Sequence, residues 1–258
     1  MRTAILLLIA ATATAQVPDG DQHWAMRAEG HQGGRAQAAH VDAAIAAYQK
    51  AIAQNPNDLE PRWKLLRAIR FKGAYVAATN EAKKPVYTIG KKAGDEALAV
   101  VARHQGPGVA EVYLWDSIIW GEWALAYGKM AAVREGAADR IRREATTSMK
   151  MDPKLEGGAA ARVLGRLHDQ TPRVPFITGW ASSKEAVRFL NESLKADPTN
   201  KITKVFLAEA MVSNDSKTKP AAIAMLRDVV KAPNDPAYEV EQAAATEDAQ
   251  ALLKKWGA

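Results

Sequence analysis

One spacing of residues recurs four times in this chain and limits what it can fold into. The pattern begins with an apolar residue and has a second apolar residue four positions later. A third residue, often small, follows after three more positions, and a proline comes soon after it. The four segments start at Ala44, Ile141, Ala186 and Ala222. Spacings of three and four place these side chains on one face of an α-helix, and the proline ends the helix. We therefore expect a series of helix hairpins.

This spacing is typical of the second helix of a tetratricopeptide repeat (TPR). Leu65, Leu66 and the turn at 73–75 match the first half of such a repeat. No segment alternates apolar and polar residues as a strand would. The sequence predicts an all-α, TPR-like helix-hairpin solenoid at 21–258, with four to five helix pairs and a capping helix at 237–256.

Three details complete this expected organisation. Residues 16–22 read as a polar lead-in without helical structure. An extra long helical unit spans about 76–105, and we expect breaks in it at Pro85 and at Gly90 or Gly94. Proline and glycine are the residues that most often interrupt helices, which is the reason for this expectation.

Composition and charge narrow the functional classes. Of the 258 residues, 48% are hydrophobic and 25% charged, as in ordinary globular proteins, and the formal net charge is +6. Basic and acidic residues are interleaved, as at 140–144, which is typical of solvated helix faces and does not indicate a nucleic-acid surface. The chain has no cysteine, which excludes disulfides, thiolate metal sites and a cysteine nucleophile.

Residues 1–15 have the pattern of a secretory signal peptide. Arg2 supplies a basic start, residues 5–9 a short apolar run, and residues 13–15 an Ala-Thr-Ala cleavage signal. We expect cleavage after Ala15, a mature N-terminus at Gln16 and a periplasmic or secreted protein. An uncleaved N-terminal helix is the alternative. The apolar run is too short to span a membrane, and we expect no later transmembrane span.

The segment 109–130 is expected to be the central helix. Tyr113, Trp120, Trp123 and Tyr127 fall on one side of it, with Asp116 among them. A strip of small residues on another side should let a neighbouring helix approach closely. That strip consists of Ser117, Gly121, Ala124 and Gly128. On this interpretation a leucine at position 121 would clash with the neighbour.

The aromatic side is the strongest candidate for a binding surface. We measure the angle of each side chain around the helix axis from Trp115. On this measure the side chains within about 60° of one another are Asp116, Trp120, Trp123 and Tyr127. They would form an apolar wall with one acceptor, suited to a ligand with an apolar body and one donor. The alternative is that the aromatics are core and that Asp116 is hydrogen-bonded within it.

Several segments also resemble a known family. They lie at 113–115, 120–123, 151–153, 162–168, 172–175 and 184–187. Together they resemble the T-component (TatT) proteins associated with tripartite ATP-independent periplasmic (TRAP) transporters. They are similar as well to the helical-repeat proteins named regulators of microtubule dynamics. The resemblance covers roughly residues 39–213.

The resemblance implies a TPR-like fold, a periplasmic location and a role beside a solute-binding protein. It further implies that interior apolar residues line a cavity or pore, and that trimers can form. The lipidated cysteine of the lipoprotein members is missing here, so membrane tethering is not implied. Arg166 and His168 lie in the matching segment at 162–168 and join the candidate binding residues, although helix packing is the plainer role for His168.

The sequence shows no constellation for catalysis or metal binding. The five histidines are scattered without metal-ligand spacing, and no nucleophile elbow is present. We therefore expect no enzyme activity and no cofactor. The first hypothesis is a periplasmic binding or scaffold protein that has a protein partner and is accessory to a transport system. The alternatives are a binder or relay of an apolar small ligand through an aromatic-lined cavity, and a purely structural scaffold.

Overall fold

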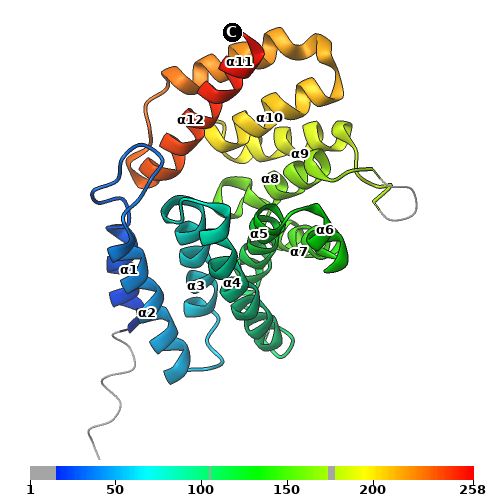
Figure 1. Cartoon of the computed structure of the whole chain (residues 1–258). Helices are drawn as coiled ribbons and strands as arrows, with labels where there is room; N and C mark the ends of the chain where they lie inside the picture. The colour runs from blue at the N-terminus through cyan, green and yellow to red at the C-terminus, as the bar shows by residue number, and fades with distance from the viewer. Residues whose placement is uncertain (1–15, 105, 174–177) are drawn as a thin grey trace, which may run out of the picture.

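A computed structural model describes residues 16–104, 106–173 and 178–258 of the chain (Figure 1). The predicted signal peptide at 1–15 lies outside these residues. The described residues form twelve α-helices and no strand. The helices are α1 (Gln16–Ala25), α2 (Ala38–Gln54), α3 (Glu60–Phe71), α4 (Asn80–Val101), α5 (Val109–Tyr127), α6 (Lys129–Arg134), α7 (Ala137–Met151), α8 (Leu155–Gln170), α9 (Ser183–Ala196), α10 (Lys201–Asn214), α11 (Lys219–Lys231) and α12 (Glu239–Trp256).

The helices pack in pairs along the chain. The pairs are α1 with α2, α3 with α4, α5 with α7, α8 with α9, and α10 with α11, while α12 follows the last pair. The short helix α6 is an addition between the members of the third pair. Five pairs and a final helix confirm the predicted all-α helix-hairpin solenoid.

The recurring spacing marks the core positions of four helices. All twelve of its residues are buried in α2, α7, α9 and α11. They are Ala44, Tyr48, Ala51, Ile141, Ala145, Ser148, Ala186, Leu190, Ser193, Ala222, Leu226 and Val229. Burying one such leucine stabilises the fold by about 1.5–3 kcal/mol, and the small residues let the paired helix come close. The prediction that this face is buried is confirmed.

Five helices form what we call the inner row: α3, α5, α8, α10 and α12. Each contacts the next member of the row as well as its own hairpin partner. The helices between them, α4, α7, α9 and α11, do not contact one another to a similar extent within the described residues. In a curved stack the helices on the inside of the bend come closest, so the inner row lies on the concave side.

The C-terminal helix contacts the N-terminal part of the chain. The last helix, α12, lies beside the loop that connects α1 to α2 (Figure 1). The guanidinium of Arg27 donates to the Glu241 carboxylate at 3.1 and 3.2 Å, and the Gly34 amide donates to Glu247 at 2.8 Å. Val240 is fully buried in the same core as α2 and α3. The capping helix therefore closes the stack into a ring.

The polar lead-in expected at 16–22 is instead the start of α1. Gly20 lies so close to α2 that an added Cβ would sit 2.5 Å from the Tyr48 ring. Asp21 accepts hydrogen bonds from the Tyr48 hydroxyl at 2.8 Å and from Lys64 at 2.6 Å. These tertiary contacts stabilise a helix that the local sequence does not indicate, so that prediction is wrong.

The breaks expected within 76–105 are also absent, because α4 runs through Pro85, Gly90 and Gly94. An added Cβ on Gly90 would lie 3.0 Å from Ile119, and one on Gly94 only 1.7 Å from the Asp116 carboxylate. The two glycines therefore allow α4 to pack directly against α5. Close approach to a neighbour, and not interruption of the helix, is their role.

The central helix differs from the prediction in two ways. It ends at Tyr127, because Gly128 adopts a φ of +89°, and α6 begins at the next residue. An added Cβ on Gly121 would meet no atom within 4 Å. At Gly121 no neighbour approaches α5, so the predicted clash at position 121 is wrong, although Ser117 of the same strip is fully buried. The glycines that allow close packing belong to α4.

Candidate functional site

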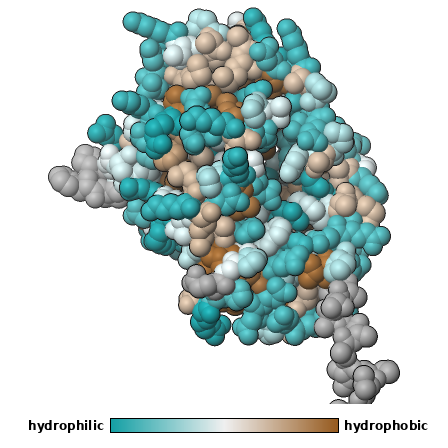
Figure 2. Space-filling model, turned by 180° about the vertical axis from the view of Figure 1, so that it is seen from behind, coloured by the Kyte–Doolittle hydropathy of each residue, from teal (hydrophilic) through white to brown (hydrophobic). Residues whose placement is uncertain are grey.

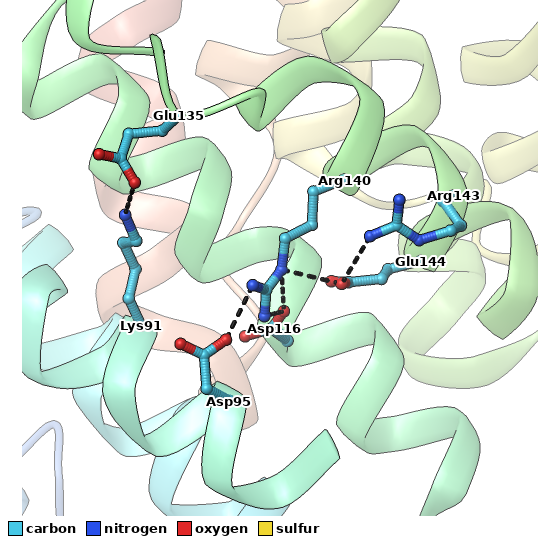
Figure 3. Close-up of polar contacts among 7 residues, drawn as sticks. All are labelled: Lys91, Asp95, Asp116, Glu135, Arg140, Arg143 and Glu144. Atoms are coloured by element: carbon cyan, nitrogen blue, oxygen red, sulfur yellow. Dashed lines mark hydrogen bonds and ion pairs between the residues drawn. The ribbon is translucent and has the colours of Figure 1, made fainter. Parts of the chain in front are cut away.

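Arg140 is the centre of an ionic cluster that also contains Asp95, Asp116 and Glu144 (Figure 3). The Arg140 guanidinium donates to the Asp116 carboxylate at 2.8 and 3.1 Å. It also pairs with Asp95 at 2.8 Å and with Glu144 at 2.9 Å. Helices α4, α5 and α7 thus each contribute charge to one cluster, in which a single arginine serves three carboxyl groups.

Asp116 and Glu144 are both deeply buried, with 0% and 3% of their side chains exposed. Burial raises the pKa of Glu144 to about 9, and the hydrogen bond with Asp116 contributes to that rise. Glu144 is therefore protonated near neutral pH and donates to Asp116, since two charged carboxylates beside one arginine would repel. A raised carboxyl pKa often marks a catalytic acid, but only 3% of the Glu144 side chain is exposed.

The Trp120 and Trp123 rings are covered by the protein's own cations. The Lys91 ammonium lies 3.9 Å from the Trp120 ring centre and 3.8 Å from that of Trp123. Arg140 lies 4.4 Å from the centre of Trp120. The two indoles are only 5% and 6% exposed. The aromatic side of α5 is thus no open wall at this point, because Lys91 occupies the place where a ligand would lie.

The remaining aromatic candidates are spread out. Tyr127 stacks on Trp123 at 4.7 Å, bonds Thr88 through its hydroxyl at 2.9 Å, and is 39% exposed. Tyr113 and Trp115 are half-buried and pack against the main core. The structure thus brings Asp116, Trp120, Trp123 and Tyr127 into one region, as α5 requires, but without a shared accessible surface.

His168 has a packing role in α8. Its Nδ1 accepts the Ser182 amide at 3.2 Å, and its ring stacks on Phe189 at 5.5 Å and meets Trp180 edge-on at 5.2 Å. Burial lowers the pKa of His168, which keeps the imidazole neutral near pH 7. The ring fixes the start of α9 against α8.

Arg166 lies in a different region of the molecule from the aromatic residues of α5. Its guanidinium donates to Glu209 at 2.7 Å and to Asp169 at 3.3 Å, and it lies 4.3 Å from the Phe206 ring centre. It borders a depression of about 240 Å³ between α8, α10 and α12, which we call the inner depression. Its lining residues are Arg166, Val205, Phe206, Glu209, Asp248, Ala251, Leu252 and Lys255.

Two charged groups of the inner depression lack partners. Asp248 and Lys255, both at exposed positions, have no hydrogen bond or ion pair among the described residues. Desolvation raises the pKa of Asp248, and the nearby Glu209 carboxylate adds to the effect. Only Arg166 of this set was a sequence candidate. The spacing of 248, 251, 252 and 255 marks one face of α12, but nothing local in the sequence shows that α8 and α10 border it.

The back of the molecule, seen from the side opposite to Figure 1, is mostly polar. Figure 2 shows a hydrophilic face on which hydrophobic residues form small, separate areas. A second, more open depression of about 350 Å³ lies on α7 and is lined by Asp139, Arg142, Arg143, Thr146, Thr147 and Lys150. Within residues 16–104, 106–173 and 178–258, no group of side chains could hold a metal ion. No helix in that part of the chain is long and apolar enough to cross a membrane.

Among solved structures, the chain is similar to a thermophilic TPR protein from Thermus thermophilus. The TM-score is 0.57 at 16% identity, covering 91% of this chain and 98% of that one. The fold is a tetratricopeptide-type helical repeat. A second similar structure, the TPR2AB domain of yeast Sti1 in complex with pHSP90, has a TM-score of 0.30 at 14% identity, covering 94% and 100%. No family model and no curated protein matches the chain.

Proposed function

We propose that this TPR-like protein is a non-catalytic binding scaffold that holds a protein partner along its inner row. The inner depression is the observation that carries this proposal. It gathers side chains from α8, α10 and α12 around an apolar floor of Val205, Phe206 and Leu252. Concave surfaces of helical repeats are where such stacks bind extended partners.

The size of the inner depression favours a protein partner over a free small ligand. Sites for small molecules usually enclose about 300–1,000 Å³, and they bury most of the ligand. An open depression of about 240 Å³ between three helices suits one or two side chains of a partner. Asp248 and Lys255 can then pair with opposite charges on that partner, which gives orientation more than affinity.

The alternative, an apolar ligand in an aromatic-lined cavity, has less support. Trp120 and Trp123 are covered by Lys91, and neither depression includes an aromatic residue of α5. An enzyme has less support again, because Glu144, the carboxyl group with the raised pKa, is sealed between helices. A protein-binding role needs neither feature.

A periplasmic setting and an accessory role in solute transport form the finer part of the proposal. The leader pattern at 1–15 supports export, and the segments that resemble T-component proteins support a solute-binding protein as the partner. Association of several copies fits the same resemblance. Sedimentation of the purified protein, alone and with a captured partner, tests whether copies associate.

Site-specific photocrosslinking tests the binding face. A crosslinking residue replaces Leu252 in the inner depression, and in a matched protein it replaces Thr147 on the outer face of α7. Both proteins are incubated with periplasmic extract of the source organism, and the adducts are identified by mass spectrometry. We expect a specific adduct at position 252 that Phe206→Ala weakens at least tenfold. An adduct only at position 147, or equal adducts at both, would contradict the proposal.

A further inference from the structure

Two arginines of the inner row, Arg67 on α3 and Arg162 on α8, leave most of their N–H donors unused. A guanidinium carries five N–H donors. The other arginines of the described chain that are not exposed are better served. Arg27 makes four hydrogen bonds, and Arg140 pairs with three carboxyl groups. The difference singles out Arg67 and Arg162.

Arg67 is held in place by aromatic rings and not by acids. Its guanidinium lies 4.2 Å from the Trp24 ring centre and 5.0 Å from that of Trp63. Its Nε is buried and has no hydrogen-bond partner among the described residues. Burial lowers the pKa of Arg67, and the neighbouring Tyr48 partly offsets this. Stacking fixes the plane of the guanidinium, and apart from a hydrogen bond with Tyr48 its donors have no partner in the described chain.

Arg162 is the more poorly compensated of the two. Its one hydrogen bond among the described residues is from Nη1 to the Thr203 hydroxyl, at 3.3 Å. Burial lowers the pKa of Arg162 to about 10, and the positive charge of Arg70 contributes to that fall. Arg70 has its own partners, the Glu122 carboxylate at 3.2 Å and the Tyr75 hydroxyl at 2.8 Å. Arg162 is therefore subject to repulsion from Arg70 and forms no ion pair among the described residues.

One acid acts on both arginines from a distance. Glu156 attracts Arg67 and Arg162, yet it forms an ion pair with neither among the described residues. Asp197 likewise attracts Arg162 without forming an ion pair with it in that part of the chain. Glu156 has a φ of +48° and is the one non-glycine with positive φ in the described chain. Such strain is retained where the surroundings demand it, and it often accompanies function. Gly157 and Gly158, with φ of +65° and +74°, continue this left-handed kink at the start of α8.

From these contacts we infer that Arg67 and Arg162 bind an oxyanion group, a carboxylate or a phosphate. The planar guanidinium fork matches both groups and binds them through two parallel N–H bonds. An anion would supply acceptors for the unused donors and would relieve the repulsion between Arg70 and Arg162. The inference deepens the proposed function and rests on it, because a partner lying on the inner row would present its acidic groups here.

Small anions test this site without any partner. The thermal midpoint of the full protein is measured against inorganic phosphate, succinate and a hexaglutamate peptide, with sodium chloride at matched ionic strength as the control. We expect a saturable rise in the midpoint with at least one oxyanion and not with chloride. Tightest binding of free phosphate or succinate identifies a small-molecule source, and tightest binding of the peptide identifies a partner's acidic segment.

Variants separate binding from structure. Arg162→Met should abolish the response, or reduce it at least tenfold, without lowering the midpoint measured in chloride alone. Arg67→Met should weaken it similarly, whereas Arg227→Met, at an exposed position of α11, should not change it. If the Arg162→Met protein does not fold, Arg162→Lys keeps the charge but loses the fork and should bind at least tenfold more weakly.

Two results would overturn the inference. One is an equal response to chloride and to the oxyanions. The other is a full oxyanion response in both Arg162 variants. A positive anion response without partner capture at position 252 would support the anion site and count against the proposed partner site, so the two proposals fail separately.

Discussion

Replacing Glu144 by glutamine should remove a pH dependence from the stability of this protein. The group has a pKa of 4.5 in an unfolded chain and of about 9 in the folded protein. Between these values the unfolded chain loses the proton and the folded chain keeps it. The stabilising contribution is therefore complete below pH 4.5 and is lost as the pH rises toward 9.

The size of the effect follows from the shift. Each pH unit in this window costs about 1.4 kcal/mol of unfolding free energy. From about pH 4.5 to about pH 7 the loss amounts to about 3 kcal/mol. Glutamine has nearly the shape of the protonated acid and can still donate to Asp116 and accept from Arg140. The Glu144→Gln variant should therefore be more stable than the wild type at pH 8, by about 5 kcal/mol.

Urea unfolding at pH 5, 6, 7 and 8 measures this difference. Stability of the wild type should fall across the series relative to the variant, and the gap should widen with pH. Glu192→Gln, at an exposed position of α9, is the control and should follow the wild type. If the profiles of wild type and Glu144→Gln run parallel, Glu144 is ionised in the folded protein and the reasoning is wrong.

Three other predictions concern packing and processing. Gly94→Ala should lower the unfolding free energy by about 3 kcal/mol or more, because the new Cβ meets the Asp116 carboxylate on α5. Gly121→Ala should raise the unfolding free energy by up to about 1 kcal/mol, because alanine has the higher helix propensity and the position is open. Urea unfolding compares the two. Trp123→Ala should cost about 3–5 kcal/mol, and Leu125→Ala, at a 62% exposed side chain, less than about 0.5 kcal/mol. Thermal unfolding separates these outcomes. N-terminal sequencing of exported protein should give Gln16 as the first residue, and an intact Met1 would contradict cleavage.

The sequence predicts the outer helices well because their signal is local. The spacing that starts at Ala44 or Ala186 lies within one helix, and a single helix face decides which residues are buried. The glycines of α4 were misjudged for the opposite reason. Gly90 and Gly94 weaken a helix considered alone, but the packing of α4 against α5 outweighs that cost.

The candidate site was harder to predict because its parts are far apart in the sequence. The aromatic face of α5 is visible in the segment itself, but the cation that covers it, Lys91, comes from α4. The inner depression joins Arg166, Phe206 and Leu252, which come from three separate helices. A single sequence carries no signal for such contacts, so only Arg166 was found.

The closure between α12 and the loop after α1 changes how this repeat protein should open and fold. In a linear stack each unit holds only its neighbours, and the end units fray independently. Here Arg27 and Glu241 are 214 positions apart and bonded, so opening at one terminus loses contacts that the other terminus also needs. The protein should therefore unfold more cooperatively than an open stack. It should also fold more slowly, because its last contacts close the longest loop in the chain.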